Sequence, residues 1–267
     1  MRITVVLGRE SYAEDDSYIK MMAALRASGH DVRECRALQA EDDASVVLSV
    51  GGDGTFLGVA RAAAPRGIPV AGVNLGHLGF LSENTAEALV DAFESGRYHV
   101  QDRTMLAAKC NGTDYLALNE ICVSRKDSSM LGIRVNIDGN ELPVYWADGL
   151  LVSTPSGSTA YSLSVGGPIV MPSSRVLTIA PVAPHNLNVR PLVVPMESRI
   201  SLRFISGSPT VRFSSDNISE TVPSDSVVDV SVAQFSLKRL CLDNSNFIKA
   251  LSEKLFWGKD KRNDNDR

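Results

Sequence analysis

The sequence has few cysteines, and none of them stand at the spacing of a metal site. Its four cysteines are spread over 267 residues without a Cys-x-x-Cys pair, at Cys35, Cys110, Cys122 and Cys241. Zinc sites and the disulfide frameworks of small secreted domains need cysteines at close or regular spacing. The sequence indicates neither, and we expect buried thiols in a reducing compartment.

Long apolar runs and an excess of basic side chains are also missing. No segment approaches the roughly 18 apolar residues of a membrane-spanning helix, and the apolar start at residues 3–7 is too short for a secretory signal. The net charge is −4, and no cluster of Lys and Arg alternates with aromatic residues, as a nucleic-acid surface requires. We expect a soluble cytoplasmic protein that contacts neither membranes nor nucleic acid.

The first hundred residues alternate between short apolar runs and stretches of helical periodicity. The runs that predict strands cover residues 3–7, a segment beginning at Val32, and residues 45–50 and 68–73. The stretches that predict helices cover residues 16–28, 56–64 and 85–94. Alternation of this kind is typical of βαβ units with a parallel sheet. The pattern predicts an α/β domain over residues 1–100.

From about residue 103 the sequence becomes rich in β-branched residues and turns. Predicted strands cover residues 116–123, 132–137, 145–152, 176–179, 192–194, 200–204, 227–232 and 235–240. The pattern predicts a mainly antiparallel, β-rich domain over residues 101–244. Beyond it we expect a C-terminal helix over residues 245–257 that packs back on the first domain. A disordered tail is expected over residues 258–267.

A glycine-rich turn, Gly51-Gly52-Asp53-Gly54-Thr55, connects a predicted strand to a helix. Backbone N–H groups at a helix start attract phosphate, and glycines let it approach the main chain. The spacing matches neither a P-loop nor a dinucleotide-binding fingerprint. Phosphates repel a carboxylate, so Asp53 either holds a metal ion or takes a proton from a hydroxyl being phosphorylated. The structural alternative is that Asp53 or Thr55 caps the helix.

Two further polar segments accompany predicted strands. Asn119-Glu120 places an amide beside a carboxylate, a pair suited to a base edge and sugar hydroxyls, although an ordinary turn is the alternative. Residues 148–168 run from Asp148 through an apolar strand into a loop of hydroxyls and small residues, where Tyr161 can stack on a ring. A Ser/Gly linker is the alternative, and the apolar strand at residues 150–152 argues against it.

These three segments together resemble the NAD kinase family, and the resemblance covers nearly the whole chain. The glycine turn also marks diacylglycerol and sphingoid-base kinases and, in a related form, 6-phosphofructokinases, so the turn selects phosphoryl transfer but leaves the substrate open. The resemblance implies phosphorylation of the 2′-hydroxyl of the adenosine ribose of NAD, with ATP or polyphosphate as the donor. It also implies that Asp53 is the general base.

The resemblance further implies which residues bind the substrates. The nucleotide-binding and substrate-binding set is Gly52, Gly54, Thr55, Asn74, Asn119, Glu120, Asp148, Ser156, Thr159, Ala160, Tyr161, Ser162, Ser164 and Ala183. Within this set, Asn119 and residues 159–161 are expected at the adenosine. Glu120, Asp148 and Ser164 are expected near the nicotinamide ribose, with Ala183 at the nicotinamide end.

Neither polar cluster has cations in its own part of the sequence. No Lys or Arg occurs between Arg36 and Arg61, or between Arg134 and Arg175. Phosphoryl transfer requires charge neutralisation. We expect Mg²⁺ carried by the nucleotide phosphates without a preformed protein cage, together with a cation from elsewhere in the fold or from another subunit. The resemblance implies a homodimer or homotetramer.

Two rival functions share part of this pattern. A lipid kinase would have the same glycine turn and would need a membrane-facing apolar or basic surface, which the sequence does not show. A dinucleotide sensor without turnover would keep the pocket, and the intact Asp53 argues against it. His77 and His185 are expected to have structural rather than catalytic roles.

Overall fold

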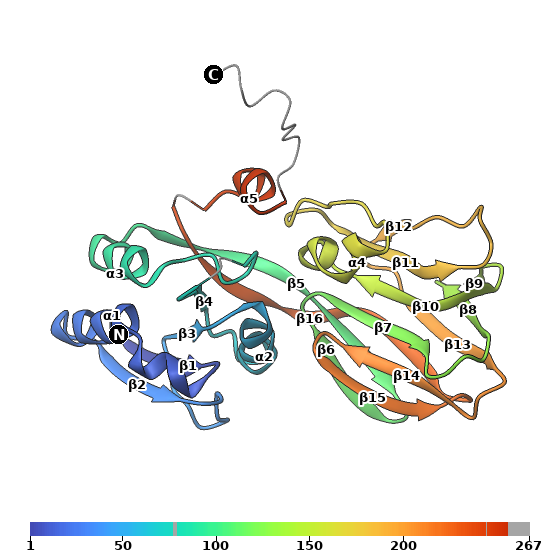
Figure 1. Cartoon of the computed structure of the whole chain (residues 1–267), viewed down its shortest axis with the longest axis horizontal. Helices are drawn as coiled ribbons and strands as arrows, with labels where there is room; N and C mark the ends of the chain where they lie inside the picture. Colours follow the sequence, from blue (N-terminus) through green and yellow to red (C-terminus); the bar gives the residue numbers. More distant parts are fainter. Residues whose placement is uncertain (77–78, 244, 256–267) are drawn as a thin grey trace, which may run out of the picture. The chain divides into compact units, whose positions relative to one another are not determined.

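The computed structural model describes residues 1–76, 79–243 and 245–255 (Figure 1). It divides the chain into two compact units, the first formed by residues 1–102 and 237–267 and the second by residues 103–236. The chain passes between the units twice, within β5 (Tyr98–Cys110) and within β16 (Val227–Leu242). Residues far apart in the sequence therefore build the first unit together.

A parallel sheet forms the centre of the first unit. Its strands, in the order β4-β3-β1-β2, are β1 (Arg2–Leu7), β2 (Asp31–Cys35), β3 (Val46–Val50) and β4 (Val70–Val73). Near the end of β16, Arg239 pairs in parallel with Val70 of β4. Strand β3 is buried along its whole length, as expected for a strand of a parallel sheet covered on both faces. The predicted α/β region is confirmed.

Helices cover both faces of this sheet. Helices α1 (Asp16–Ala27) and α3 (Ala86–Ser95) pack on one face, and α2 (Asp53–Ala63) contacts β3 and β4 from the other (Figure 1). Short 3-10 turns, η1 (Glu10–Glu14) and η2 (Ala64–Arg66), precede α1 and follow α2. The last helix of the unit is α5 (Phe247–Lys254).

The helix ends follow the capping residues in the sequence. Asp15 caps α1 by accepting hydrogen bonds from two backbone N–H groups, and Thr85 caps α3 by accepting one, from Ala88. Gly96 ends α3 with φ of 67°, a conformation that favours glycine. Asn246 caps α5. These caps explain why the observed bounds lie close to the predicted ones.

Antiparallel strands form the second unit, which confirms the predicted β-rich region. The strands not yet introduced are β6 (Thr113–Ala117), β7 (Glu120–Arg125), β8 (Leu131–Ile137), β9 (Asn140–Glu141), β10 (Tyr145–Ser153), β11 (Val176–Pro184), β12 (Leu192–Pro195), β13 (Ile200–Ser206), β14 (Thr210–Ser215) and β15 (Ile218–Pro223). One sheet has the order β15-β14-β7-β10-β11-β12, and another runs β10-β8-β13-β16.

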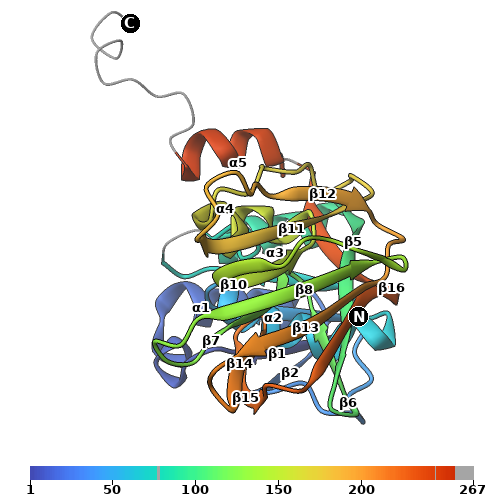
Figure 2. The same ribbon diagram turned by 90° about the vertical axis from the view of Figure 1, so that its right-hand side faces the viewer.

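Strand β10 belongs to both of these sheets. Its first residues, Tyr145 and Trp146, pair with β8, whereas residues 149–153 pair with both β7 and β11. Figure 2 shows β8 beside β13, with β10 and β11 continuing on the other side of β8. Buried side chains from both sheets form one apolar cluster that includes Leu150, Phe213 and Val228. This cluster is the core of the second unit.

Several predicted elements differ from the observed ones. The single strand predicted at residues 116–123 is interrupted between β6 and β7, whereas the two strands predicted at residues 227–232 and 235–240 form the continuous β16. The residues left out between the two predicted strands, 233 and 234, continue the strand, and the exposed side chain of Gln234 fits its outer face. Helix α2 begins at Asp53 rather than at residue 56, because glycines obscured its first turn.

The unit boundaries can be set beside the expected domains. The second unit ends at Ser236, so residues 237–243 belong to the first unit rather than to the β-rich part. The tail expected at residues 258–267, the end of the expected helix at residues 256–257, and His77 lie outside the described residues. Within the described chain, no helix combines the length and apolar character needed to span a bilayer.

Candidate active site

The carboxyl ends of three parallel strands meet at one edge of the first sheet. The backbone N–H of Gly8, after β1, donates to Val50 O at 2.9 Å, and that of Gly51, after β3, donates to Val73 O at 2.8 Å. Asn74 follows β4. Open parallel sheets bind ligands at this edge, because loops and helix starts converge there. The glycine turn therefore lies where a phosphate site is expected.

The glycines of the turn have different roles. Gly51 has φ of 149°, and a Cβ atom there would lie 2.7 Å from Thr55 Oγ1. A Cβ atom at Gly52 or Gly54 would meet no atom within 4 Å, and both residues are exposed. Packing within the chain therefore requires glycine at position 51 but not at 52 and 54. At those two positions, the missing side chains leave the main chain open to a ligand.

Asp53 does not cap the helix that it begins. The N-cap of α2 is Gly52, which has no side chain that could cap the helix. The Asp53 carboxylate instead accepts hydrogen bonds from the backbone N–H groups of residues 80–82, at 2.9 to 3.1 Å. A Cβ atom at Gly79 would clash with this carboxylate. The capping alternative, for Asp53 and for Thr55, is therefore wrong.

These three hydrogen bonds leave room for one more proton donor. A carboxylate has about four lone-pair sites. Within the described chain, Oδ1 of Asp53 accepts the N–H groups of Leu81 and Ser82, and Oδ2 accepts that of Phe80. Oδ2 thus keeps a lone pair that can accept the proton of a substrate hydroxyl. The carboxylate is oriented and still able to act as a base.

Two cations lie behind the segment that holds Asp53, and both come from the end of the chain. The Arg239 guanidinium donates to Phe80 O at 3.0 Å and to Leu81 O at 3.2 Å. The Lys254 ammonium donates to Gly79 O and lies 5.1 Å from the centre of the Phe80 ring. The sequence around residue 53 does not reveal Arg239 and Lys254, because both are about two hundred residues away along the chain.

Asn74, predicted to line the site, is engaged in its own turn. Its Oδ1 accepts the backbone N–H of Gly76 at 2.7 Å, and its backbone N–H donates to Asn84 O at 2.9 Å. A side chain that hydrogen-bonds the main chain two residues later is typical of an Asx turn. The structure places Asn74 at the correct sheet edge, and its contact with a ligand stays a prediction.

In the second unit, Asp216 fixes the turn that carries Asn119 and Glu120. Its carboxylate accepts the backbone N–H groups of Leu118 at 2.8 Å, Asn119 at 2.8 Å and Glu120 at 3.1 Å. Asp216 lies between β14 and β15 with φ of 50°. We missed this residue in the sequence, although Asp216-Asn217 is a typical hairpin turn between two β-type runs.

Glu120 has a buried carboxyl oxygen that no described residue satisfies. Its Oε2 is inaccessible and has no hydrogen-bond partner in the described part of the chain. Burial, followed by the charge of Asp216, raises the pKa of Glu120 to about 8, whereas the backbone N–H of Tyr161 opposes the shift. Glu120 is therefore protonated at neutral pH and can donate a hydrogen bond. Such a group fits a sugar hydroxyl or an amide.

The hydroxyl-rich loop packs directly against Asn119 and Glu120. Oγ1 of Thr154 donates to Leu118 O at 2.6 Å, and its backbone N–H donates to Asn119 O at 2.9 Å. A Cβ atom at Gly157 would clash with Asn119 O. The loop contains a 3-10 turn, η3 (Ser156–Thr159), and the short helix α4 (Tyr161–Ser164). The linker alternative is wrong, because this segment is packed and largely buried.

The side chains of this loop differ in how they can meet a ligand. Tyr161 is 41% exposed and Ser164 is also exposed, so both are accessible. Ser162 is fully buried, and a Cβ atom at Gly167 would clash with its Oγ. The remaining predicted residues of the loop are half-buried: Ser156, Thr159 and Ala160. Tyr161 is thus available for stacking, whereas the Ser162 hydroxyl points into the fold.

Asp148 and Ala183 lie opposite each other on β10 and β11. Ala147 pairs with Pro184 and Gly149 with Val182, which places the two residues at the same level. Arg125 of β7 contacts both oxygens of Asp148, at 2.8 and 3.0 Å. The His185 ring lies 3.8 Å from Asp148. Arg125 supplies the cation that the sequence around the second cluster lacks.

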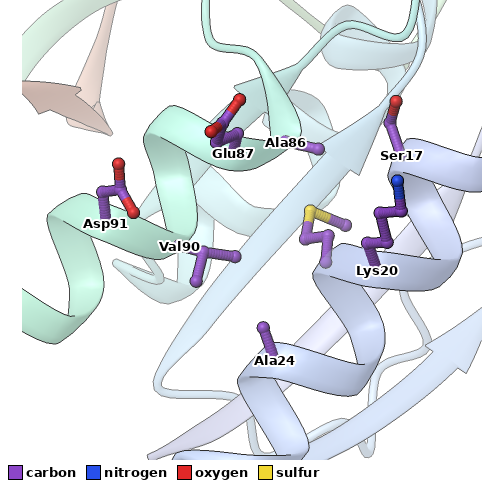
Figure 3. Close-up of a pocket in the computed structure, with 8 residues that line it drawn as sticks. Ser17, Lys20, Ala24, Ala86, Glu87, Val90 and Asp91 are labelled. Carbon is purple, nitrogen blue, oxygen red and sulfur yellow. The ribbon is translucent and has the colours of Figure 1, made fainter.

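The predicted site residues form two groups, one in each unit. Gly52, Asp53, Gly54, Thr55 and Asn74 belong to the first unit, and the others belong to the second. A separate hollow of about 340 Å³ lies between α1 and α3, and it is lined by Lys20 on α1 and Glu87 on α3 (Figure 3). None of the predicted site residues lines this hollow.

Comparison with known proteins identifies the family. The chain matches the family models of the ATP-NAD kinase N-terminal domain over residues 7–97 and the ATP-NAD kinase C-terminal domain over residues 118–241. The NAD kinase of Bacteroides fragilis is 42% identical over 228 residues, covering 82% of this chain and 79% of that protein. The NAD kinase of Flavobacterium johnsoniae is 35% identical over 260 residues, covering 93% and 88%.

Solved structures share the fold. The crystal structure of yeast NADH kinase complexed with NADH gives a TM-score of 0.87 at 22% identity, covering 97% of this chain and 88% of that chain. An NAD kinase from Archaeoglobus fulgidus in complex with ATP gives 0.79 at 27% identity, covering 96% and 99%. The chain therefore belongs to the NAD kinase family, and its activity is that of an NAD kinase.

Proposed function

We propose that Asp53 is the general base of the NAD kinase reaction. As the 2′-oxygen of the adenosine ribose attacks the terminal phosphorus of the donor, its O–H bond breaks and the proton passes to Asp53 Oδ2. The new P–O bond forms while the bond from phosphorus to the leaving nucleotide breaks. The observation that carries this role is the carboxylate held by three N–H groups beside the open glycine turn.

The glycine turn binds the phosphates of the donor in this proposal. The missing side chains of Gly52 and Gly54, together with the start of α2, suit an anion that approaches the main chain. ATP is the proposed donor, and polyphosphate is the alternative with the same phosphate chemistry. The related Archaeoglobus fulgidus structure contains ATP, which supports ATP as the donor here.

A divalent ion, Mg²⁺, is proposed to arrive with the donor phosphates rather than in a protein cage. In residues 1–76, 79–243 and 245–255, no three His, Cys, Asp or Glu side chains are grouped closely enough to hold a metal ion. A metal ion on the phosphates neutralises part of their charge during transfer. The residues of this chain contribute the turn, the base and the nearby cations.

NAD binds to the second group of residues in this proposal. Glu120 offers a protonated carboxyl with an unpaired buried oxygen, and Tyr161 offers an exposed ring. Asn119 directly precedes Glu120, and its carbonyl oxygen accepts the backbone N–H of Thr154 from the hydroxyl-rich loop. Asp148 and Ala183 provide the nicotinamide end of the site. The yeast structure with the same fold was solved with NADH, which agrees with a dinucleotide as the proposed ligand.

The active form is proposed to be a cytoplasmic homodimer or homotetramer. Among the described strands, β12 pairs only with β11 and so leaves one edge open. Leu192 and Val193 on β12 and the neighbouring Leu187 are exposed, with Leu187 at 87%. An exposed apolar edge strand favours association with another chain. A second copy of this chain is the proposed partner.

The role of Asp53 is tested with Asp53→Asn, which removes the base with little change in size. We expect NADP formation to fall by roughly a hundredfold or more, while NAD affinity is largely kept. A coupled dehydrogenase assay measures NADP, and calorimetry measures NAD binding. Asp91→Asn, at an exposed position of α3, is the matched control and should keep full activity. Wild-type turnover in Asp53→Asn would exclude Asp53 as the base.

A further inference from the structure

The segment that holds Asp53, residues 79–82, is bound on both of its polar sides. Its N–H groups at residues 80–82 donate to the Asp53 carboxylate. Its carbonyl groups at residues 79–81 accept hydrogen bonds from Lys254 and Arg239. The peptide units therefore lie between an anion and two cations. Hydrogen bonds to charged groups are stronger than those between neutral groups, so both sides contribute to holding the segment.

The two cations are held by contacts of different kinds. Arg239 has a side chain that is only 6% exposed and forms an ion pair at 2.9 Å with Glu83. Oγ of Ser245 also donates to Glu83, at 2.6 Å. Lys254 is half-buried in the last turn of α5 and lies over the Phe80 ring. Arg239 thus belongs to a buried network, whereas Lys254 reaches the segment from a surface helix.

The electrostatic surroundings of Lys254 connect it to Asp53. Burial lowers the pKa of Lys254, and the negative charges of Glu83 and Asp53 act in the opposite direction, whereas Arg239 lowers it further. The ammonium therefore keeps a hydrogen bond to the segment at the expense of part of its hydration. A half-buried lysine in this position contacts Gly79 and Phe80, the two residues next to the Asp53 carboxylate.

We propose that Lys254 is a positioning residue for the catalytic base: it fixes the Gly79 carbonyl, so that the N–H of Phe80 in the same peptide unit aims the Asp53 carboxylate at the substrate hydroxyl. Helix α5 is then part of the catalytic apparatus. Arg239 supports the same segment from the buried side. This inference rests on the proposed role of Asp53, and the experiment below separates the two.

Lys254→Met is the main variant, because methionine keeps the apolar stem of lysine and removes its charge. We expect kcat to fall roughly tenfold to a hundredfold, the scale for a misplaced catalytic group. The KM for NAD should stay within about threefold, because Lys254 is not placed at the NAD site. Lys254→Arg, which keeps a cation for Gly79 O and the Phe80 ring, should recover most of the lost kcat.

Lys249→Met is the matched control on the same helix. Lys249 is exposed and forms an ion pair with Glu253 one turn later, so its loss should leave kcat unchanged. Thermal unfolding of every variant shows whether α5 remains folded. If Lys254→Met proves unstable, Lys254→Leu replaces it, because leucine keeps an apolar contact for the Phe80 ring and has no donor for Gly79 O. A kcat for the folded variant equal to that of Lys249→Met overturns the inference.

Combining Lys254→Met with Asp53→Asn shows whether lysine acts through the aspartate. Residues that act as a unit are not additive, so the double variant should be no slower than Asp53→Asn alone. A further loss comparable to that of the single variant means an independent role and overturns the positioning inference. If Asp53→Asn itself keeps full turnover, the role of Asp53 fails instead. If only Lys254→Met keeps full turnover, the inference alone fails.

Discussion

Glu120 is a residue whose charge state changes on folding. Its pKa rises from an ordinary 4.5 to about 8, because the carboxyl is buried and lies near Asp216. Cys122 and Tyr161 also face it, and a charge on Glu120 would raise the pKa of both. Between these two pKa values the folded protein holds a proton that the unfolded chain has released. Protonation of Glu120 therefore contributes fully to the free energy of unfolding below about pH 4.5. This contribution is lost as the pH rises to about 8.

Glu120→Gln should reduce this loss of stability, because glutamine resembles the protonated carboxyl and does not titrate. We expect the wild-type melting temperature to fall more between about pH 6 and about pH 9 than that of the variant. Thermal unfolding followed by circular dichroism at the two pH values measures the difference. The exposed Glu87→Gln is the control and should retain the wild-type pH dependence. Identical pH dependence in Glu120→Gln would contradict the raised pKa.

At the level of single residues, the sequence indicated the chemistry of Asp53 but not the residues that hydrogen-bond to it. The glycines around Asp53 indicated a phosphate site, and family resemblance added the role of a base. The N–H groups that orient Asp53 come from residues 80–82, and the cations behind them from Arg239 and Lys254. These contacts arise only when distant segments fold together, so a local reading of the sequence around residue 53 cannot show them.

The same structural device occurs in each unit: an aspartate that accepts three consecutive backbone N–H groups. Asp53 does so from the start of a helix and Asp216 from the tip of the β14–β15 hairpin. In such a loop, the backbone N–H groups make charge-assisted hydrogen bonds to the carboxylate, which fix the conformation of the loop. In both cases the fixed loop contacts or carries predicted site residues. The β14–β15 hairpin therefore holds the turn to which we assign NAD binding.

Asp216→Ala should disturb the Asn119-Glu120 turn without removing a ligand-binding side chain. Three N–H groups lose their acceptor, so we expect a melting temperature lower by several degrees and a KM for NAD raised roughly tenfold. Steady-state kinetics and thermal unfolding measure both effects. Asp225→Ala, at an exposed turn after β15, should change neither. An unchanged KM in Asp216→Ala would show that the turn keeps its shape without this carboxylate.

At the level of elements, periodicity located the strands and helices with strong patterns, such as β3 and α1. It missed β14, which has only Val211 and Phe213 as apolar residues, and β15, which is exposed along most of its length and carries polar residues on both faces. It joined β6 and β7 into one strand, because the break between them depends on Asp216, about a hundred residues later. Apolar patterning predicts elements that face a core, but not those set by distant polar contacts.

The four cysteines are all free, and because they lie in both units, their reactivity reports on the packing of the whole molecule. Cys110, Cys122 and Cys241 are buried, and only Cys35 is partly exposed. Burial raises the pKa of Cys35 and Cys110, and raises that of Cys122 to about 12, which suppresses the reactive thiolate. The two units should therefore protect their thiols in the native state.

Alkylation with iodoacetamide followed by mass spectrometry tests this protection. We expect no more than one label, on Cys35, in the native protein and four labels after unfolding in denaturant. A reducing agent should leave the melting temperature unchanged, because no disulfide connects the described cysteines. Rapid native labelling of Cys110 or Cys241 would show that the core around it opens.

The division of the first unit between the two ends of the chain has a consequence for biosynthesis. A ribosome completes the glycine turn and Asp53 early, but Arg239 and Lys254 only after the whole second unit has been made. The segment that aims the base therefore stays without its cationic supports until the nascent chain is nearly complete. A fragment that ends before residue 237 lacks both cations and the end of β16, so we expect premature termination to yield protein with a poorly positioned base.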